Sequence, residues 1–149
     1  MTVNFADEDG KYFKEIPDIS EHHGRLFLSE KAYDVLQDLL EAAGEFLPVK
    51  YASGNGYMFN PLQYAESVDG VDYQLSQKDE FNDVISLGFH ENKVRKFMAF
   101  RSEFSYLNDL ICQEELKERI EKNNLKGVLI TQVLGNRSAA FNPELYLNS

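Results

Sequence analysis

The chain has 149 residues, of which 43% are hydrophobic and 13% aromatic, enough apolar material for one sizeable core, which argues against disorder of the whole chain. Its net charge of −10, from 25 acidic and 15 basic residues, opposes binding to phosphate backbones and to anionic membrane surfaces. No apolar run approaches the roughly 20 residues that a membrane-spanning helix needs.

The first 44 residues predict an arm followed by a helix. Residues 1–23 are polar and indicate an arm with at most one short strand. The apolar run 25–28 leads to Ser29, whose hydroxyl is placed to cap a helix, and Gly44 is placed to end it in a left-handed conformation. Apolar residues recur between them at helical spacing: Ala32, Tyr33, Leu36, Leu39, Leu40 and Ala43.

The next segment predicts a hairpin. Residues 45–52 form a strand pattern in which Pro48 requires a sheet edge or a bulge, because proline donates no hydrogen bond. Residues 53–56, Ser-Gly-Asn-Gly, have turn composition, and residues 57–60 resume the extended pattern. Residues 62–66 are a candidate further strand.

The middle of the chain predicts shorter strands. A short extended piece is expected at residues 71–75, and two strands at residues 84–89 and 97–100. The polar stretch 90–96 between those two strands indicates a second hairpin, although its basic residues could equally begin the later strand.

A second helix is predicted at residues 113–123, with Cys112 at the cap position. Ile111 and Leu116 have the spacing of a hydrophobic staple around that cap. Two acid–base pairs follow at four-residue spacing, Glu115 with Arg119 and Glu118 with Lys122. Leu116 and Ile120 form its apolar stripe.

Residues 127–134 predict a final strand, and the tail 135–149 contains apolar residues that favour docking. Strands outnumber helices and occur in hairpins. The sequence therefore predicts a single α+β domain over residues 1–149, with a mixed or mostly antiparallel sheet and two main helices packed against it.

Candidate catalytic and metal-binding residues do not assemble into a motif. His22, His23 and His90 lack the spacing of a metal site and are interpreted as exposed turn residues. Cys112 at a helix start would have a lowered pKa, yet no histidine lies near it in the sequence, so a structural role is favoured. We expect no metal, no cofactor and no enzymatic activity.

The glycine-rich turn and the acidic clusters also lack the pattern of a binding site. Residues 54–56 are too short for a phosphate-binding loop and lack its lysine and following helix. The acidic groups at positions 66, 69 and 72 and at positions 79, 80 and 83 lack the spacing of a calcium loop, so solvated loops are favoured.

The amino terminus and the cysteine count favour the cytosol, while the charge leaves two interpretations open. Acidic residues stand at the amino terminus where a secretory signal would have a basic region and an apolar region. One cysteine cannot form an internal disulfide framework. The excess of acidic residues serves solubility or steers the protein toward a basic partner.

Several stretches, taken in order, resemble a known family. They are 26–36 (LFLSEKAYDVL), 44–49 (GEFLPV), 99–101 (AFR), 111–117 (ICQEELK) and 125–128 (LKGV). This order is similar to that of bacterial immunity proteins of the immunity-eleven type, over roughly residues 25 to 134. Cys112 departs from the family pattern, which usually has serine or threonine there.

The resemblance implies a non-catalytic cytosolic antidote that binds and neutralises a cognate toxin. A basic toxin face would suit the acidic chain. We expect aromatic anchors at Tyr51 and Tyr57, with Phe59 more suited to the core. The expected acidic rim is Asp79, Glu80 and Asp83.

Two other functions are compatible with the residues. An adaptor or chaperone for a secreted protein would share the acidity and the lack of motifs. An enzyme of an unrecognised class would be favoured by a bound metal or by a deep polar pocket around His90. The sequence leaves open the toxin, the contacting surface and the oligomeric state.

Overall fold

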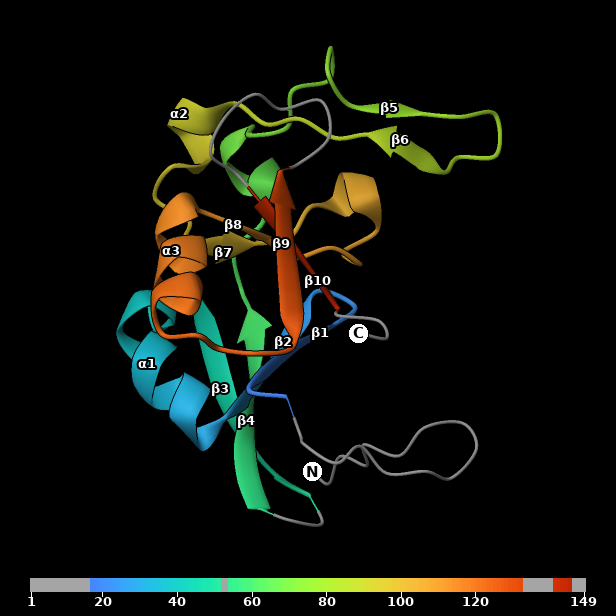
Figure 1. Cartoon of the computed structure of the whole chain (residues 1–149). Coiled ribbons are helices and arrows are strands. Elements are labelled where there is room, and N and C mark those ends of the chain that lie inside the picture. Colours follow the sequence, from blue (N-terminus) through green and yellow to red (C-terminus); the bar gives the residue numbers. More distant parts are fainter. Residues whose placement is uncertain (1–16, 52–53, 133–140, 146–149) are drawn as a thin grey trace.

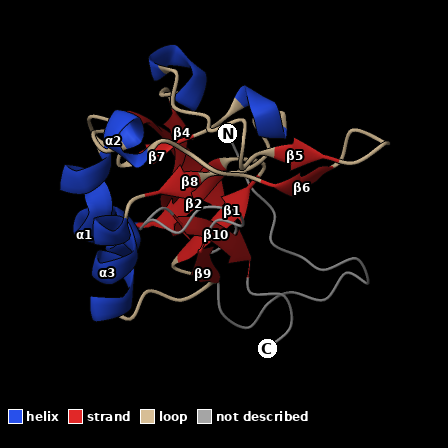
Figure 2. Cartoon of the chain, turned by 90° about the horizontal axis from the view of Figure 1, so that it is seen from above, coloured by secondary structure: helices blue, strands red, loops and turns tan. Residues whose placement is uncertain are grey.

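A computed structural model describes residues 17–51, 54–132 and 141–145 of the chain. In this part, two four-stranded antiparallel sheets pack with two main helices, and a small two-stranded sheet lies away from these helices (Figure 1). Seen from above, both main helices lie on one flank of the sheets (Figure 2). The predicted α+β class, with antiparallel pairing and two main helices, is confirmed.

The first sheet has the strand order β1-β2-β4-β3, with every neighbouring pair antiparallel. Its strands are β1 (Ile19–His22), β2 (Arg25–Ser29), β3 (Gly44–Tyr51) and β4 (Gly54–Pro61). Strand β3 lies at the edge, where Pro48 can be accommodated, as predicted. Strand β1 is the short strand expected in the arm, and residues 1–16 lie outside the described part.

The predicted β3–β4 hairpin is confirmed, but its turn was placed too far along the chain. Gly54, Asn55 and Gly56 belong to strand β4 and pair with β3. A side-chain carbon at Gly56 would lie 2.6 Å from the Leu28 carbonyl oxygen and 2.7 Å from the Phe27 ring. Glycine is therefore required at position 56 because the strands pack closely there. The sequence pattern alone suggests a turn at this position.

Helix α1 (Glu30–Leu40) begins as predicted and ends earlier than predicted. The Ser29 hydroxyl accepts a hydrogen bond from the Ala32 amide at 3.1 Å. Glu41 closes the helix in a right-handed conformation. Gly44 is not a left-handed cap: it starts β3, where a side-chain carbon would lie 2.2 Å from the Asn60 carbonyl oxygen.

The second sheet has the order β7-β8-β10-β9 and is also antiparallel. Its strands are β7 (Ala99–Phe100), β8 (Ile111–Cys112), β9 (Val128–Gln132) and β10 (Phe141–Leu145). Strand β9 confirms the strand predicted at residues 127–134, of which residues 133–134 lie outside the described part, but it is not the final strand because β10 follows it. Strand β10 comes from the predicted tail and lies between β8 and β9, so this part of the tail completes the sheet.

Helix α3 (Glu114–Lys122) confirms the second predicted helix, with Gln113 and not Cys112 at its cap position. Cys112 cannot serve there because it is the last residue of β8 and pairs with Ala99 and Phe141. The predicted staple is wrong for the same reason. Within the strand, Ile111 faces the opposite side from Cys112 and packs in a different cluster from Leu116.

The charged pairs of α3 also differ from the prediction. Arg119 does not pair with Glu115; its Nη1 lies 2.9 Å from Asp38 of α1 and also donates to the Val35 carbonyl oxygen at 3.0 Å. These bonds tie the two helices together. Between the described residues of α3 itself, the ion pair is that of Lys117 with Glu121 at 3.5 Å.

Residues 62–98 contain the largest departures from the prediction. This region holds η1 (Ala65–Val68), β5 (Gln77–Lys78), β6 (Val84–Ser86) and α2 (Glu91–Val94), with η2 (Glu103–Ser105) after β7. The expected strand at 62–66 is instead one bridge at Tyr64 followed by η1. At 71–75, one bridge at Val71 precedes a turn.

The predicted second hairpin is wrong. Helix α2 occupies the stretch that was expected to be its turn, and β6 pairs with β5 while β7 pairs with β8. A helical turn suits this stretch because it buries Val94 while its polar neighbours stay in water.

The core lies in two main clusters. The larger one joins α1 and α3 to both four-stranded sheets and includes the fully buried Phe59, as predicted. The second one joins the middle segment to Phe100 and Ile111. Arg101 of the family-like stretch 99–101 is also buried and donates to the Pro61 carbonyl oxygen at 3.0 Å, so it holds the end of β4.

Candidate interaction surface

The interpretation of the histidines as exposed turn residues holds for His23, which is exposed in the turn after β1, and is wrong for His22 and His90, which are partly buried and lie outside turns. His22 is half-buried at the end of β1, and its Nε2 lies 2.8 Å from the Ser20 hydroxyl. Burial lowers the pKa of His22, with a smaller effect from His23. His90 precedes α2, with Nδ1 3.8 Å from an Asp72 carboxylate oxygen. Across the described ranges, no group of three or more metal-binding side chains comes together.

The thiol of Cys112 has the wrong environment for a nucleophile. It is fully buried at the end of β8, in the core cluster that also contains residues of α1 and α3. Burial raises the pKa of Cys112 to about 12, so the thiol is protonated at neutral pH. The prediction that this residue is structural agrees with its place in the core.

The predicted aromatic anchors Tyr51 and Tyr57 lie on opposite faces of the first sheet. Tyr57 faces α1 and stacks on Tyr33, with ring centroids 3.9 Å apart. Tyr51 packs edge-on against Phe27 on the other face, with centroids 5.6 Å apart. Both rings are partly committed to internal packing, so these two tyrosines do not form one binding surface.

The predicted acidic rim lies elsewhere. Asp79, Glu80 and Asp83 stand in the turn between β5 and β6, at the opposite end of the molecule from the β3–β4 turn (Figure 1). The five predicted contact residues therefore divide between two regions. Only the acidic three share a loop.

Within that loop, Asp79 has a structural role. Its Oδ1 accepts hydrogen bonds from the Phe81 amide at 2.8 Å and the Asp83 amide at 2.9 Å. Its own amide donates to the Asp83 carbonyl oxygen at 2.9 Å. Glu80 and Asp83 are exposed, and Asn82 adopts a left-handed conformation with φ of 64°. The turn is thus fixed by local bonds.

Exposed hydrophobic side chains gather around the same hairpin. Among the described residues, seven large hydrophobic side chains are exposed, and five of these lie on the hairpin, just before it or against its base. The five are Tyr73, Leu75, Phe81, Ile85 and Tyr106. Phe81 is 75% exposed, the highest value of the seven. We call these five residues, with Asp79, Glu80 and Asp83, the β5–β6 surface.

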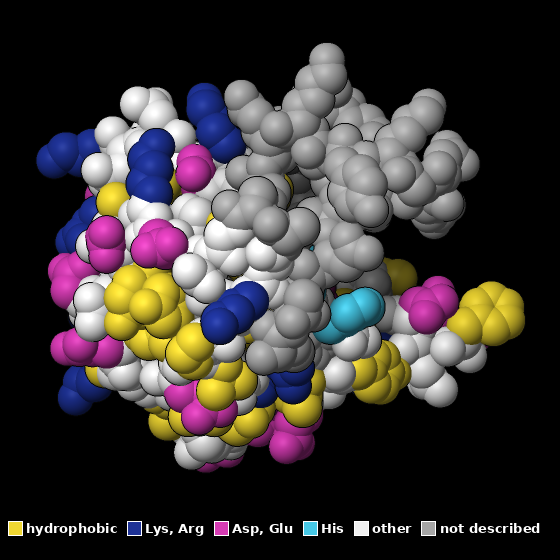
Figure 3. Space-filling view, turned by 90° about the horizontal axis from the view of Figure 1, so that it is seen from below, with side chains coloured by type: hydrophobic (Ala, Val, Ile, Leu, Met, Phe, Trp, Pro, Cys, Tyr) yellow, Lys and Arg dark blue, Asp and Glu magenta, His cyan; other side chains and the backbone are white. Residues whose placement is uncertain are grey.

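The β5–β6 surface projects from the body of the molecule. A narrow projection carries hydrophobic and acidic side chains next to each other (Figure 3). An exposed aromatic side chain beside charged residues is the usual composition of a contact patch, because the ring supplies buried area and the charges supply orientation.

The base of the hairpin is held by aromatic rings. The ammonium group of Lys78 lies 4.4 Å from the ring centroids of both Phe104 and Tyr106. The Tyr106 hydroxyl donates to the Asn82 carbonyl oxygen at 2.7 Å. Phe104 also meets Tyr73, with centroids 6.0 Å apart.

Glu66 anchors these rings to the body of the protein. Its carboxylate accepts hydrogen bonds from the Ser102 hydroxyl at 2.7 Å, the Glu103 amide at 2.9 Å and the Phe104 amide at 3.0 Å. The prediction of a solvated loop is therefore wrong for Glu66. This carboxylate accepts hydrogen bonds from the amides at the start of η2, the helical turn that contains Phe104.

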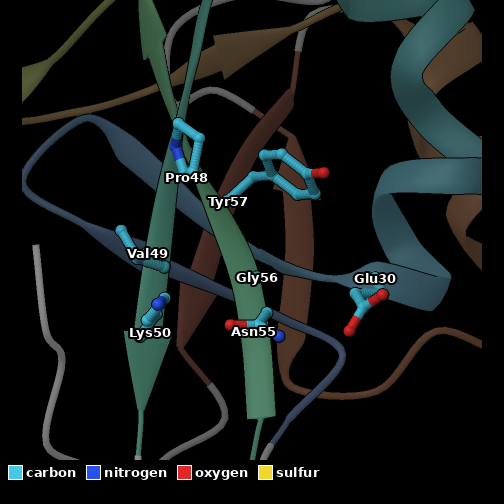
Figure 4. A pocket seen from close by; sticks show the side chains of 7 residues that line it. All are labelled: Glu30, Pro48, Val49, Lys50, Asn55, Gly56 and Tyr57. Atoms are coloured by element: carbon cyan, nitrogen blue, oxygen red, sulfur yellow. The ribbon is translucent and has the colours of Figure 1, made fainter.

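A second surface feature is a hollow of about 390 Å³ beside the turn end of the β3–β4 hairpin. Its lining residues are Glu30, Pro48, Val49, Lys50, Asn55, Gly56 and Tyr57. Figure 4 shows the Tyr57 ring extending from β4 toward α1, with Glu30 beyond it. The lining has one acid and one base and holds neither histidine nor cysteine, so it offers no pattern typical of catalysis.

Sequence reasoning missed the apolar members of the β5–β6 surface. Phe81 stands between two acidic residues and an asparagine, in Asp-Glu-Phe-Asn-Asp. Such polar turn residues around one aromatic side chain indicate an exposed ring. That signal was present at position 81. Tyr106 carried none, because its contact with the hairpin depends on the fold.

Comparison with known proteins places the chain in a family. Among the described residues, no helix is long and apolar enough to cross a membrane. No curated protein sequence matches the chain. The model of the "Immunity protein family (Imm11)" matches residues 2–135, most of the chain. The chain therefore belongs to the Imm11 family of immunity proteins.

Proposed function

We propose that this chain is a non-catalytic immunity protein that binds and neutralises a cognate bacterial toxin in the cytosol. The observation that carries the proposal is the family match over residues 2–135. An immunity protein must recognise another protein, and the chain offers a projecting surface suited to that task in the β5–β6 surface.

The placement of the reactive side chains supports binding over catalysis. The Cys112 thiol is buried and protonated, and His22 is held by Ser20. Arg101 and Glu66 hold loops together through backbone hydrogen bonds. These charged and nucleophilic groups serve the fold, which leaves surface recognition as the task that the molecule is suited to perform.

The net charge supports a basic partner. With a charge of −10, the chain attracts a basic toxin face over a distance of about 10 Å at moderate salt. This attraction raises the association rate, which an antidote needs because the toxin acts before the complex forms.

The test is co-expression with the product of the neighbouring toxin-like gene. Host growth is scored with and without this chain, and the two proteins are then co-purified. Rescue of growth with a stoichiometric complex is the expected result. Rescue without a complex would indicate an enzyme that reverses the damage, and absence of both would contradict the proposal.

A further inference from the structure

The β5–β6 surface combines three features. It projects, its apolar side chains are exposed, and its backbone is fixed by hydrogen bonds. An exposed aromatic side chain on a flexible loop would lose much of its contact energy to ordering. On a fixed turn, that cost has already been met during folding.

Charge distinguishes between possible occupants of this surface. Residues 77–86 contain three acids and one base, and the base, Lys78, is covered by the Phe104 and Tyr106 rings. A second copy of this chain would bring the same acids against them and a net charge of −10. A partner with basic residues around an apolar depression would instead complement both the ring and its rim.

We propose that the β5–β6 hairpin enters a cleft of the toxin, where Phe81 fills an apolar pocket and Glu80 and Asp83 meet basic residues at its rim. This inference rests on the proposed immunity function and names the surface that performs it. Asp79 acts as a positioning residue because its carboxylate holds the Phe81 and Asp83 amides. The Tyr51 and Tyr57 region then lies outside the contact.

The structure also decides which substitutions test this proposal. Reversing the charge of Asp79 would break the turn as well as the rim, so it cannot separate the two effects. Glu80 and Asp83 are exposed, and neither side chain makes a hydrogen bond in the described structure. The double variant Glu80→Lys/Asp83→Lys therefore tests charge, and Phe81→Ala tests the anchor. Leu47→Ala, at a 44% exposed position on β3, is the matched control.

The experiment measures the affinity and association rate of each variant for the purified toxin, with thermal unfolding confirming that each is folded. Phe81→Ala is expected to weaken binding by about 30-fold or more, as a central aromatic anchor does. The double lysine variant is expected to slow association about 10-fold at low salt, with the difference shrinking at high salt. Leu47→Ala should bind like the wild type.

The outcomes separate the two proposals. If the wild type binds the toxin and folded Phe81→Ala binds within about 2-fold of it, the docking inference is overturned while the immunity function stands. If the wild type neither binds the toxin nor protects the host, both fail. If Phe81→Ala abolishes only a concentration-dependent self-association, the hairpin is a contact between copies, and the docking inference is again overturned.

Discussion

The two hairpins β3–β4 and β5–β6 share the same backbone pattern but have different roles in the molecule. The β3–β4 hairpin has eight paired residues per strand and contributes side chains to both faces of a sheet. The β5–β6 hairpin has two residue pairs with a register shift between them, and it carries the most exposed large hydrophobic side chain of the described residues.

The difference shows that short strand pairing does not by itself imply a loose hairpin. The β5–β6 turn is fixed by the Asp79 carboxylate, the Tyr106 hydroxyl and the ring contacts of Lys78. In β3–β4 the apolar side chains stabilise the fold. In β5–β6, polar groups hold the turn, so the apolar side chains remain available for a partner.

The largest expected effect is a difference in the free energy of unfolding between a substitution in β3–β4 and one in β5–β6. Phe59→Ala in β4 should lower the free energy of unfolding by about 3–5 kcal/mol, because the ring is fully buried between α1 and the sheet. Phe81→Ala in the β5–β6 turn should change it by no more than about 0.5 kcal/mol. Urea unfolding followed by circular dichroism measures both. Equal costs would refute the distinction.

A smaller effect tests the close packing of β4. Gly56→Ala should cost about 1–3 kcal/mol, because the added carbon meets the Leu28 carbonyl oxygen and the Phe27 ring. Gly54→Ala is the matched control in the same strand. There the nearest atom is the Tyr51 hydroxyl oxygen at 3.2 Å, at the end of a flexible side chain. If both variants unfold at the same urea concentration, the packing explanation is wrong.

The next effect concerns the fixed β5–β6 turn. Asp79→Ala removes an acceptor from two amides and should cost about 1 kcal/mol, while Glu80→Ala should have no measurable effect on stability. Amide hydrogen exchange at Phe81 and Asp83 should accelerate in the first variant and not in the second. Unchanged exchange in Asp79→Ala would show that other contacts hold the turn.

The smallest effect is a pH dependence that arises from His22 in the first sheet. Residues 77–86 hold no histidine, whereas half-buried His22 ends β1 with a pKa lowered by burial. The unfolded chain therefore binds a proton more readily than the folded one, and stability falls as pH drops below the ordinary value of 6.5. His22→Gln should reduce the loss of stability between pH 7 and pH 5.5. A variant with the same pH profile as the wild type would contradict this assignment.

The sequence predicted the elements whose positions depend on residues close together in the chain. Helical spacing and Ser29 predicted the start of α1, and Pro48 predicted an edge strand. Strands β7 and β8 have two residues each, too few for any period to specify their partners. Strand β10, Phe-Asn-Pro-Glu-Leu, contains a proline and a charge, so its place between β8 and β9 depends on pairing across distant segments.

The candidate site divides in the same way. The exposure of Glu80 and Asp83 could be predicted because charge is visible in the sequence. Tyr51 and Tyr57 could be named as candidate anchors from their residue type, but their places on opposite faces of the sheet follow from the pairing register. The contacts of Lys78 with the Phe104 and Tyr106 rings join residues more than twenty positions apart, and no local pattern in the sequence predicts them.

The most direct test of the central claim is hydrogen–deuterium exchange, measured by mass spectrometry, of the wild-type chain with and without its toxin. Binding of the toxin should slow exchange in peptides covering residues 72–86 and Tyr106, and leave exchange over residues 44–61 unchanged. Slower exchange over residues 44–61, with residues 72–86 unaffected, would contradict this claim and place the contact on the β3–β4 hairpin.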